Sequence, residues 1–526
     1  MSATINTNDL SFFVFGSGHD YTLNNSGTGE GAQWFSHPFM AKGSRAYAGM
    51  YYFLVADENG DLIDAVKDDI AHCTFTPALG DTFDTVGEQE IRVDYRHEYI
   101  YDDETLVVEK HLKQKITVVD HGAVTTSYYN QKIYEDGYCY VHPTADYVSR
   151  YNGWFFSGSF KKLSSFPWGT VAVYNISTDI EDISELAYAD MSGFTSFNKM
   201  FYSCSKLTNL SGVETWDISN VTDMAQMFYG CNKLVSIEGV ENWNTAKVTK
   251  MYNTFGGCTL LADLTPLSTW DTSKVITLQG MFWGCGIVTT DGLENFTFES
   301  TNSLYQMFYT CKSLTDLKGI SGWNVSNIND MAEMFLRCSH LTNLKPLKDW
   351  DVSNVQRMSS MFGDTVLGSS SGGRLTSLDG LENWDVSNVK FFDSMFSVQF
   401  WLDDISALSH WDVSSGINFS NMFLGMACLN LTAISGWDMS SATTITSMFN
   451  NGHKADSSQL GKYVIDVDGG STYFDYDGTS YRSYQLGTIT FIEQDASAVA
   501  GWNVPSGQTA FFDGGSTTWT NIPSWN

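Results

Sequence analysis

Charged residues and proline are scarce in this sequence, and long apolar runs are missing from it. Only 17% of the 526 residues are charged, and 8 are proline. The basic side chains are the rarer sign, with 29 Lys and Arg against 60 Asp and Glu, for a formal net charge of −31. So acidic a chain repels phosphate backbones and anionic lipid, so we expect neither nucleic acid nor a membrane surface among its partners. No run of about 18 apolar residues occurs, so no membrane span is predicted.

The first residues also lack a basic segment followed by an apolar one, so no secretory signal is expected there. The chain is not poor in apolar residues as a whole. Hydrophobic residues make up 43% of it, including 34 Phe, 26 Tyr and 16 Trp, which is enough for a large core and excludes disorder. Its length allows three or more domains.

A repeat of about 27 residues occupies the middle of the chain. Its clearest mark is the pair Met-Phe, with Phe255 filling one further place. The pair recurs at Met200-Phe201, Met227-Phe228, Met281-Phe282, Met307-Phe308, Met334-Phe335, Met361-Phe362, Met395-Phe396, Met422-Phe423 and Met448-Phe449.

Other positions keep the same spacing. A tryptophan is followed each time by an acid or amide, two leucines stand three residues apart, and a Gly or Pro follows them. The tryptophans are Trp216, Trp243, Trp270, Trp323, Trp350, Trp384, Trp411 and Trp437. The Gly or Pro position is held by Gly212, Gly239, Pro266, Gly319, Pro346 and Gly380.

These positions predict a local structure for each repeat. Met224, Met227 and Phe228 have the i, i+3, i+4 spacing of one helix face, so a short helix is expected there. The Leu-x-x-Leu segment predicts a short strand, and the Gly or Pro predicts a turn after it. One repeat cannot offset the conformational entropy of about 27 ordered residues, but stacked repeats bury one another's faces.

The pattern W-D-V-S-N-V-x-x-M-x-x-M-F-x-x-C-x-x-L-T-x-L, seen most clearly from Trp323 to Leu344, resembles the BspA-like leucine-rich repeats of bacterial surface proteins and mycoplasma lipoproteins. The resemblance covers a little over half of the chain. It implies a leucine-rich-repeat solenoid of parallel strands and short helices that acts in adhesion and protein binding. The chain departs from that family in lacking an export signal and a recognisable wall anchor.

The flanking regions predict a mixed, mainly β fold around the solenoid. Residues 1–122 have alternating segments at 73–77, 86–95 and 115–120 and a hairpin signal at 57–61. They resemble immunoglobulin-like modules of phage and bacterial surface proteins and are predicted to anchor the chain. Residues 123–178 are predicted to be a connector and cap, residues 179–455 a solenoid of about ten repeats, and residues 456–526 a small β domain with strands at 463–470, 473–478 and 487–492.

Two rows of repeat residues could carry chemistry. The cysteines Cys204, Cys231, Cys258, Cys285, Cys311 and Cys338 share one position and lack the close pairs of a metal site, so we expect small buried hydrophobes rather than disulfides or metal ligands. The Asp or Asn after each tryptophan could form a calcium ladder, but turn capping explains the residue type. Asp466, Asp468, Asp475 and Asp477 could also hold calcium, and Asp-Gly hairpin turns explain them more simply.

Ligand binding is expected on the polar residues that flank the second leucine, because they differ between repeats. The alternatives are a merely solvated face and the aromatic segment Gln399-Phe400-Trp401. The candidate residues are Asn209, Glu238, Asp263, Asp316, Lys318, Asn343, Lys345, Asp379 and Asp404.

No nucleophile motif, paired-histidine zinc motif or phosphate loop appears, so no catalytic residue, metal or cofactor is predicted. The sequence predicts a non-enzymatic structural protein of adhesion, which binds a protein or glycan on a cell surface. One location is the surface of a bacteriophage virion, as a capsid decoration or fibre-like component attached through the N-terminal region. The row of unpaired cysteines favours cytoplasmic assembly and hence the virion. The alternatives are a bacterial cell-surface adhesin and, less favoured, a hydrolase with a dispersed site.

Overall fold

The protein is described from a computed structural model of all 526 residues. The described residues are 39–42, 46, 54–56, 62–64, 69–101, 104–128, 131–141, 154–156, 158–164, 166, 170–174, 176–189, 191, 193–364, 373–399, 402, 404–426, 431–449, 465–467, 470–472, 475–476, 481–482, 494–504, 510–511 and 519–520. They form two compact units, Met1–Val221 with Glu238–Asn244, and Thr222–Ile237 with Thr245–Asn526.

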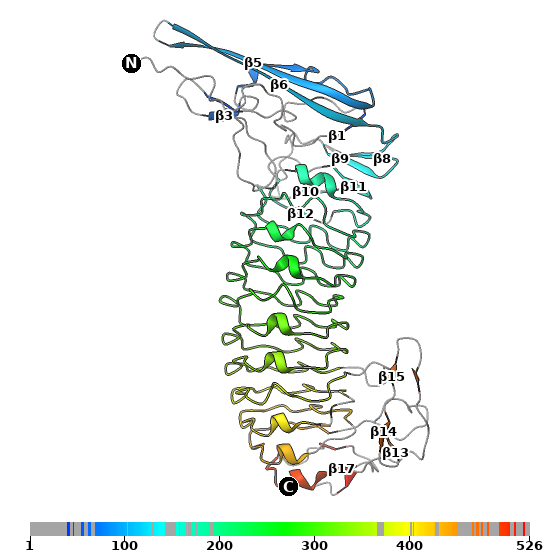
Figure 1. The fold of residues 1–526 in the computed structure, drawn as a ribbon, viewed down its shortest axis with the longest axis vertical. Helices are drawn as coiled ribbons and strands as arrows, with labels where there is room; N and C mark the ends of the chain where they lie inside the picture. The colour runs from blue at the N-terminus through cyan, green and yellow to red at the C-terminus, as the bar shows by residue number, and fades with distance from the viewer. Residues whose placement is uncertain are drawn as a thin grey trace. The chain divides into compact units, whose positions relative to one another are not determined.

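The fold is mainly β, and the helices in the described part of the chain are short 3-10 helices (Figure 1). This confirms the prediction of a mixed, mainly β fold. The strands are β1 Phe39–Ala41, β2 Leu54–Ala56, β3 Leu62–Asp64, β4 Cys73–Thr76, β5 Gly87–Tyr101, β6 Glu104–Val119, β7 Val124–Tyr128, β8 Gln131–Tyr134, β9 Tyr138–Val141, β10 Trp154–Phe155, β11 Lys162–Leu163, β12 Val173–Tyr174, β13 Ile465–Val467, β14 Gly470–Thr472, β15 Asp475–Tyr476, β16 Tyr481–Arg482, β17 Gln494–Asp495 and β18 Trp519–Thr520. The 3-10 helices are Ile70–His72, Ser184–Tyr188, Val240–Asn242, Thr265–Leu267, Lys318–Ile320, Lys345–Leu347, Ser406–Leu408, Leu431–Ile434 and Ala496–Val499.

A four-stranded sheet in the order β1-β6-β5-β4 dominates the start of the first unit. Its centre is the long antiparallel hairpin of β5 and β6. Ile91, Val93 and Tyr95 are buried, whereas Arg92 and Arg96 on the opposite face of the strand are exposed, as a half-buried strand requires. The strands predicted at 73–77, 86–95 and 115–120 are therefore confirmed, and β2 and β3 pair antiparallel around the predicted hairpin signal.

A second sheet, in the order β11-β9-β8-β7, follows within residues 123–163. A buried polar network ties it to the helix Ser184–Tyr188. The Tyr138 hydroxyl donates to Glu185 Oε2 at 2.7 Å, and Lys162 Nζ lies 3.1 Å from the same carboxylate. The pKa of Tyr138 is raised by its burial and by the charge of Glu185. Because each of these polar groups has a partner, the network stabilises the packing of the sheet against the helix.

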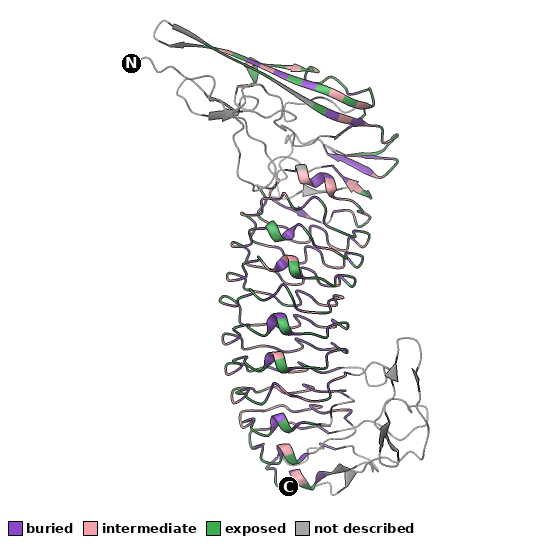
Figure 2. Cartoon of the chain, viewed as in Figure 1, coloured by how far each residue is buried: buried purple, intermediate pink, exposed green. Residues whose placement is uncertain are grey.

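In the second unit, successive repeats form coils that stack through a ladder of backbone hydrogen bonds. Met224 N donates to Lys250 O at 2.9 Å, and Phe228 N donates to Thr254 O at 2.8 Å. Isolated parallel bridges mark the same ladder in later coils, from Ser303 to Asp330, Asp330 to Arg357, Arg357 to Phe391, Phe391 to Asn418 and Asn418 to Thr444. The interior of the coils is buried and the turns between are exposed (Figure 2).

Aromatic columns fill this core. Phe335 stacks on Phe362 with ring centroids 5.7 Å apart, and Trp323 stacks on Trp350 at 6.1 Å. At least seven of the eight repeat tryptophans also donate their indole N–H to a backbone carbonyl of an earlier coil. Trp350 Nε1, for example, donates to Ile320 O at 3.1 Å. Tryptophan suits this position because its ring fills the core and its N–H satisfies a buried carbonyl.

The helix predicted at the Met-x-x-Met-Phe segment is not formed. In each coil the residue before the second Met is left-handed, as at Gln226 with φ 57° and Asn253 with φ 51°. A left-handed residue interrupts the i to i−4 pattern, so the alternate N–H groups turn toward the next coil instead. The inter-coil ladder therefore lies at this segment, where a helix was expected.

The strand predicted at the Leu-x-x-Leu segment is replaced by turns and 3-10 helices. Parallel bridges occur there only between Thr289 and Asp316 and between Ser377 and Asp404 among the described residues. In three coils the Gly or Pro position falls inside a 3-10 helix, at Pro266, Gly319 and Pro346. Pro346 stands in the first turn of its helix, and a side chain at Gly319 would overlap the Thr290 carbonyl of the preceding coil. At Gly319 the absence of a side chain therefore allows the two coils to approach closely.

Strands β13 and β15 lie within the strands predicted at 463–470 and 473–478, and they pair antiparallel with β14 and β16. The strand predicted at 487–492 lies outside the described residues. Although residues 456–526 were expected to form a separate domain, part of that range joins the stack. Trp502 stacks on Trp437, and Phe449 N donates to Ala510 O at 2.7 Å.

Candidate functional site

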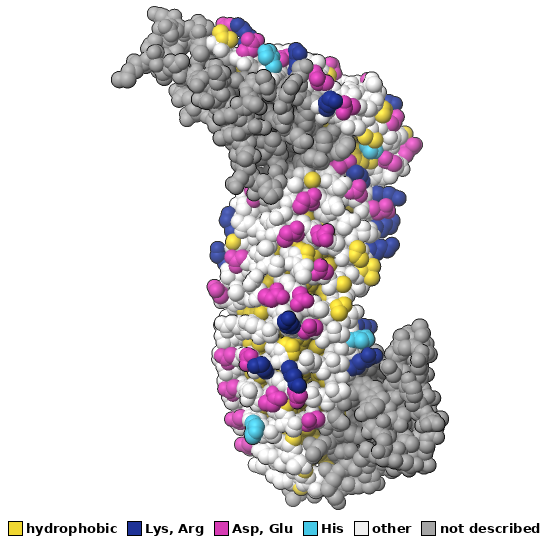
Figure 3. Space-filling model, viewed as in Figure 1, with side chains coloured by type: hydrophobic (Ala, Val, Ile, Leu, Met, Phe, Trp, Pro, Cys, Tyr) yellow, Lys and Arg dark blue, Asp and Glu magenta, His cyan; other side chains and the backbone are white. Residues whose placement is uncertain are grey.

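The polar residues predicted to bind a ligand lie on the outside of the coils. Eight of the nine are exposed, and Asp379 is half-buried. Acidic side chains are scattered over the visible face with a few Lys and Arg among them (Figure 3). Because the leucines between them are buried, these positions can vary without changing the core.

Five of the nine have a structural task in addition. The side-chain oxygen of each accepts a hydrogen bond from the backbone N–H two residues later, at the start of a turn or 3-10 helix. The pairs are Asn209 with Ser211, Asp263 with Thr265, Asp316 with Lys318, Asn343 with Lys345, and Asp404 with Ser406. The pKa of Asp404 is lowered by the hydrogen bonds from Ser406. Their residue type therefore follows from capping, and their freedom to recognise a ligand is correspondingly reduced.

The two lysines are freer of such a role. Lys318 and Lys345 each project from the first residue of a 3-10 helix and are exposed. Lys345 Nζ lies 3.1 Å from Asp379 Oδ2, and both side chains remain largely in water. Such an exposed ion pair contributes little to stability, so the charges are available to a ligand.

A row of half-exposed aromatic side chains was missed by the sequence analysis. Tyr229 stacks on Trp283 at 5.7 Å although they lie two repeats apart, and Trp283 stacks on Tyr309 at 6.3 Å. Gly256 occupies the corresponding position between them, where a side chain would lie 3.0 Å from the Tyr229 ring. The sequence does contain a signal for this row, because an aromatic residue directly follows the Met-Phe pair in these three repeats. Phe400 and Trp401, the aromatic alternative, lie outside the described residues.

The repeat cysteines are buried and form no disulfide, as predicted. They also do something that the prediction of small hydrophobes missed. Cys258, Cys285, Cys311 and Cys338 donate their S–H to the backbone carbonyl of the phenylalanine of an earlier coil, as Cys311 Sγ does to Phe282 O at 3.0 Å. Burial raises the pKa of Cys311 to about 12. Such thiols are poor nucleophiles and poor metal ligands at neutral pH.

In at least seven of the eight repeats the Asp or Asn after the tryptophan caps the following turn, which confirms the predicted role. Asp351 Oδ1 accepts from Ser353 N at 3.1 Å, and Asn324 Oδ1 accepts from Ser326 N at 3.2 Å in the same way. The hydrogen bonds from Ser353 lower the pKa of Asp351. Of the candidate calcium residues, Asp466 lies in β13 and Asp475 in β15, whereas Asp468 and Asp477 lie outside the described residues.

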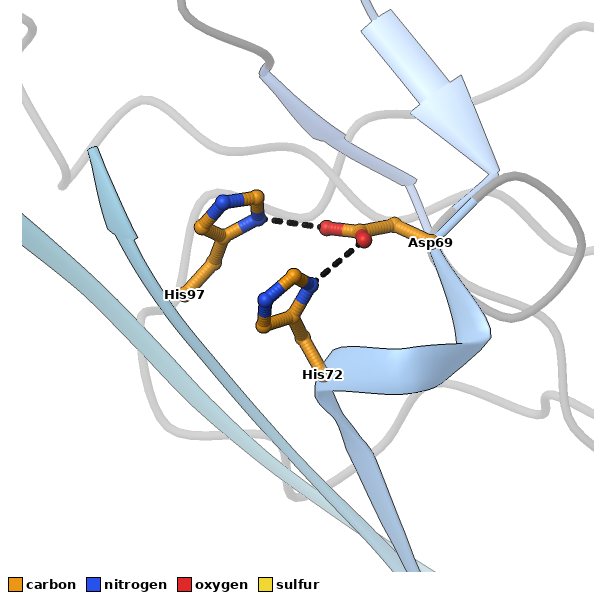
Figure 4. Close-up of side chains that lie close together, drawn as sticks. All are labelled: Asp69, His72 and His97. Carbon is orange, nitrogen blue, oxygen red and sulfur yellow. Dashed lines mark hydrogen bonds and ion pairs between the residues drawn. The ribbon is translucent and has the colours of Figure 1, made fainter.

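One cluster of ionisable side chains stands apart from the repeats, in the first unit. Asp69 precedes the 3-10 helix Ile70–His72, and its carboxylate lies between two imidazoles (Figure 4). Asp69 Oδ1 is 2.5 Å from His72 Nδ1, and Asp69 Oδ2 is 2.6 Å from His97 Nδ1 on β5. The Tyr95 hydroxyl donates to Asp69 Oδ2 at 2.7 Å.

Burial raises the pKa of Asp69, but the hydrogen bonds from Tyr95, His72 and His97 outweigh it and hold the pKa below its usual value. The carboxylate is therefore ionised at neutral pH. Sequence reasoning passed over this cluster because His97 lies 25 residues beyond His72. Only the pairing of β4 with β5, which sets Cys73 opposite Tyr95, brings the two histidines together.

The residues described above define a mainly β repeat protein whose coils stack through parallel backbone ladders. Among the described residues, every helix is too short to cross a membrane. The family described as "Mycoplasma protein of unknown function, DUF285" matches residues 195–317, 286–374 and 369–474, which together cover more than half of the chain. The chain belongs to that family. No curated protein matches it.

Proposed function

We propose that this chain is a non-enzymatic display protein, with a leucine-rich-repeat solenoid of the BspA-like type that binds a protein or glycan ligand on a cell surface. The observation that carries the proposal is the division of each coil into a constant interior and a variable exterior. The tryptophan, methionine, phenylalanine and leucine positions are buried in coil after coil, whereas the outward residues beside them change in size and charge. In such a scaffold the buried residues maintain the fold, so the outward residues can vary to form a recognition surface.

The lysines at Lys318 and Lys345 are the outward residues best placed to recognise a ligand. They stand at equivalent positions of successive coils, and the 3-10 helices that they begin lie against each other. Together they place two positive charges close to each other on a chain whose net charge is −31. A ligand with acidic groups at matching spacing would be steered to them.

The N-terminal region serves as the anchor in this proposal. All four strands of the β1-β6-β5-β4 sheet lie within residues 1–122, so this part contains its own hydrogen-bonded sheet. Attachment to a phage virion surface is the favoured location because the repeat thiols are not joined in disulfides. The second location is the bacterial cell surface.

Two fragments test the anchor and the location together, one of residues 1–122 and one of residues 123–526. Each is produced during assembly of the particle, and the purified particles are analysed for the fragment. The proposal expects residues 1–122 to co-purify with particles and residues 123–526 to stay free. Attachment by the repeat fragment alone would place the anchor at the other end, and attachment of neither would favour the cell-surface location, which is checked by antibody labelling of intact cells.

A further inference from the structure

We propose that Asp69, His72 and His97 form a binding site for one divalent transition-metal ion, and that zinc is the ion that this donor set fits best. The proposal concerns the first unit and is independent of ligand binding by the repeats. The three ligand atoms lie within 4.8 Å of one another, a separation that one ion could bridge with small movements.

The arrangement is unusual for simple hydrogen bonding. A single carboxylate faces two imidazole Nδ1 atoms, one on each oxygen, and the two rings stack with centroids 3.7 Å apart. One carboxylate–imidazole pair is a common structural contact, but two stacked imidazoles turned toward the same group bring three donors to one point (Figure 4).

The supporting structure holds the donors in place. His97 lies on β5, which is hydrogen-bonded on one side to β6 and on the other to β4. His72 ends the 3-10 helix that Asp69 precedes, so the two side chains are three residues apart on one turn. The Tyr95 hydroxyl, 2.7 Å from Asp69 Oδ2, orients the carboxylate as an outer hydrogen-bond partner does in metal sites.

The donor types select among metals. Two imidazole nitrogens and one carboxylate oxygen suit zinc and its neighbours in the first transition row, whereas calcium and magnesium prefer sites made of oxygen atoms. The side chains of Asp69, His97 and His72 are 16%, 24% and 39% exposed, so an ion can enter and a water molecule can complete its coordination. Bound metal would join the turn at residues 69–72 to β5 and so stabilise this sheet.

The test uses the full chain without a polyhistidine tag, because a tag would itself bind metal. The protein is stripped with a chelator and titrated with zinc chloride by calorimetry, and separately with cobalt chloride, whose visible absorption reports its coordination. We expect one zinc ion per chain with a dissociation constant in the micromolar range or below, a cobalt spectrum of low coordination number, and no comparable response to calcium chloride.

His97→Gln is the test variant, and His111→Gln is the matched control. His111 is an exposed histidine on β6 of the same hairpin, where its Nδ1 lies 2.5 Å from Asp94 Oδ1. We expect His97→Gln to weaken zinc binding at least tenfold and His111→Gln to leave it unchanged. Circular dichroism of both variants without metal shows whether they fold, and Asp69→Asn replaces His97→Gln if that variant does not.

The thermal midpoint of the sheet gives a second readout. Zinc should raise the unfolding temperature of the wild-type chain and of His111→Gln, but not that of folded His97→Gln. The proposal is overturned if the wild-type chain binds no zinc, or if the folded His97→Gln variant binds zinc as tightly as the wild-type chain does. In that case the cluster is a set of hydrogen bonds only.

Discussion

The indole of Trp502 lies parallel to that of Trp437, with ring centroids 6.3 Å apart and an interplanar angle of 6°. Trp502 Nε1 donates to Ile434 O at 3.3 Å, which repeats the hydrogen bond that the other repeat tryptophans make. Phe511 likewise stacks on Phe449 at 5.3 Å. A segment more than fifty residues past the last Met-Phe pair therefore covers the final coil and shields its aromatic core from water.

Replacing Trp502 by alanine should destabilise this end of the stack by about 3–5 kcal/mol, since a buried aromatic side chain and a hydrogen bond are both lost. Trp502→Phe keeps the stacking and loses only the N–H donor, so it should cost about 1 kcal/mol. Hydrogen exchange should show faster exchange in the last coils of Trp502→Ala, with earlier coils unchanged. Unaltered protection at Met448 and Phe449 would mean that Trp502 does not close the stack.

Two glycines of one coil, Gly319 and Gly322, allow a controlled test of how closely the coils pack. A side chain at Gly319 would overlap the backbone carbonyl of Thr290, whereas a side chain at Gly322 meets nothing within 4 Å. Gly319→Ala should therefore cost at least about 2 kcal/mol, because the backbone of two coils must separate, and Gly322→Ala should change stability by less than about 1 kcal/mol. Chemical denaturation of both variants measures the difference. Equal stabilities would show that the coils are not packed as closely as described.

The capping aspartates should make the stack sensitive to acid. The pKa values of Asp271, Asp351 and Asp412 are all lowered by hydrogen bonds from the serine two residues later. A lowered pKa in the folded state means that the stabilisation is present above about pH 4 and is lost as the pH falls further. The triple variant Asp271→Asn/Asp351→Asn/Asp412→Asn keeps the caps, as Asn324 does in the same position.

The wild-type chain and this triple variant should have similar unfolding temperatures at pH 7. Between about pH 4 and pH 2 the wild-type chain should lose more stability than the variant, because three more of its caps become protonated. Parallel acid-dependence of both proteins would assign the acid sensitivity to other carboxylates.

The repeat thiols should be unreactive while the chain is folded. Burial raises the pKa of Cys311 to about 12 and that of Cys285 well above its usual value. Iodoacetamide at pH 8 should label the half-buried Cys73 first and reach Cys311 only after unfolding in guanidinium chloride, because a thiol rather than a thiolate is present in the core. Mass spectrometry of the labelled peptides measures both rates. Labelling of Cys311 in the folded protein as fast as that of Cys73 would contradict its burial.

The repeat unit, its buried positions and the N-terminal strands could be predicted from the sequence, because each depends on a spacing within a short segment. The helix expected at Met224, Met227 and Phe228 was wrong for a physical reason. The i, i+3, i+4 spacing places side chains on one face of any tight turn, and only the left-handed conformation of Gln226 shows that the turns do not form a helix. A polar residue in that position gives little warning, since Gln, Asn, Glu and Ser all occupy it.

The contacts between distant segments were beyond the sequence. Trp502 is separated from Trp437 by a segment that does not keep the repeat spacing, so its place in the stack depends on packing alone. Asp69, His72 and His97 meet only through strand pairing. The donation of the Cys311 thiol to Phe282 O depends on the register between coils, which the cysteine spacing does not define.

The central claim is that the outward residues of the repeats recognise a ligand, and a comparison of two folded proteins tests it most directly. The variant Lys318→Glu/Lys345→Glu reverses two exposed charges and leaves the caps from Asp316 and Asn343 to the backbone in place. Both proteins are fluorescently labelled and applied to a glycan array and to intact bacterial cells at physiological salt. The account predicts equal unfolding temperatures, binding by the wild-type chain, and binding at least tenfold weaker for the variant. Equal binding by both proteins would contradict it.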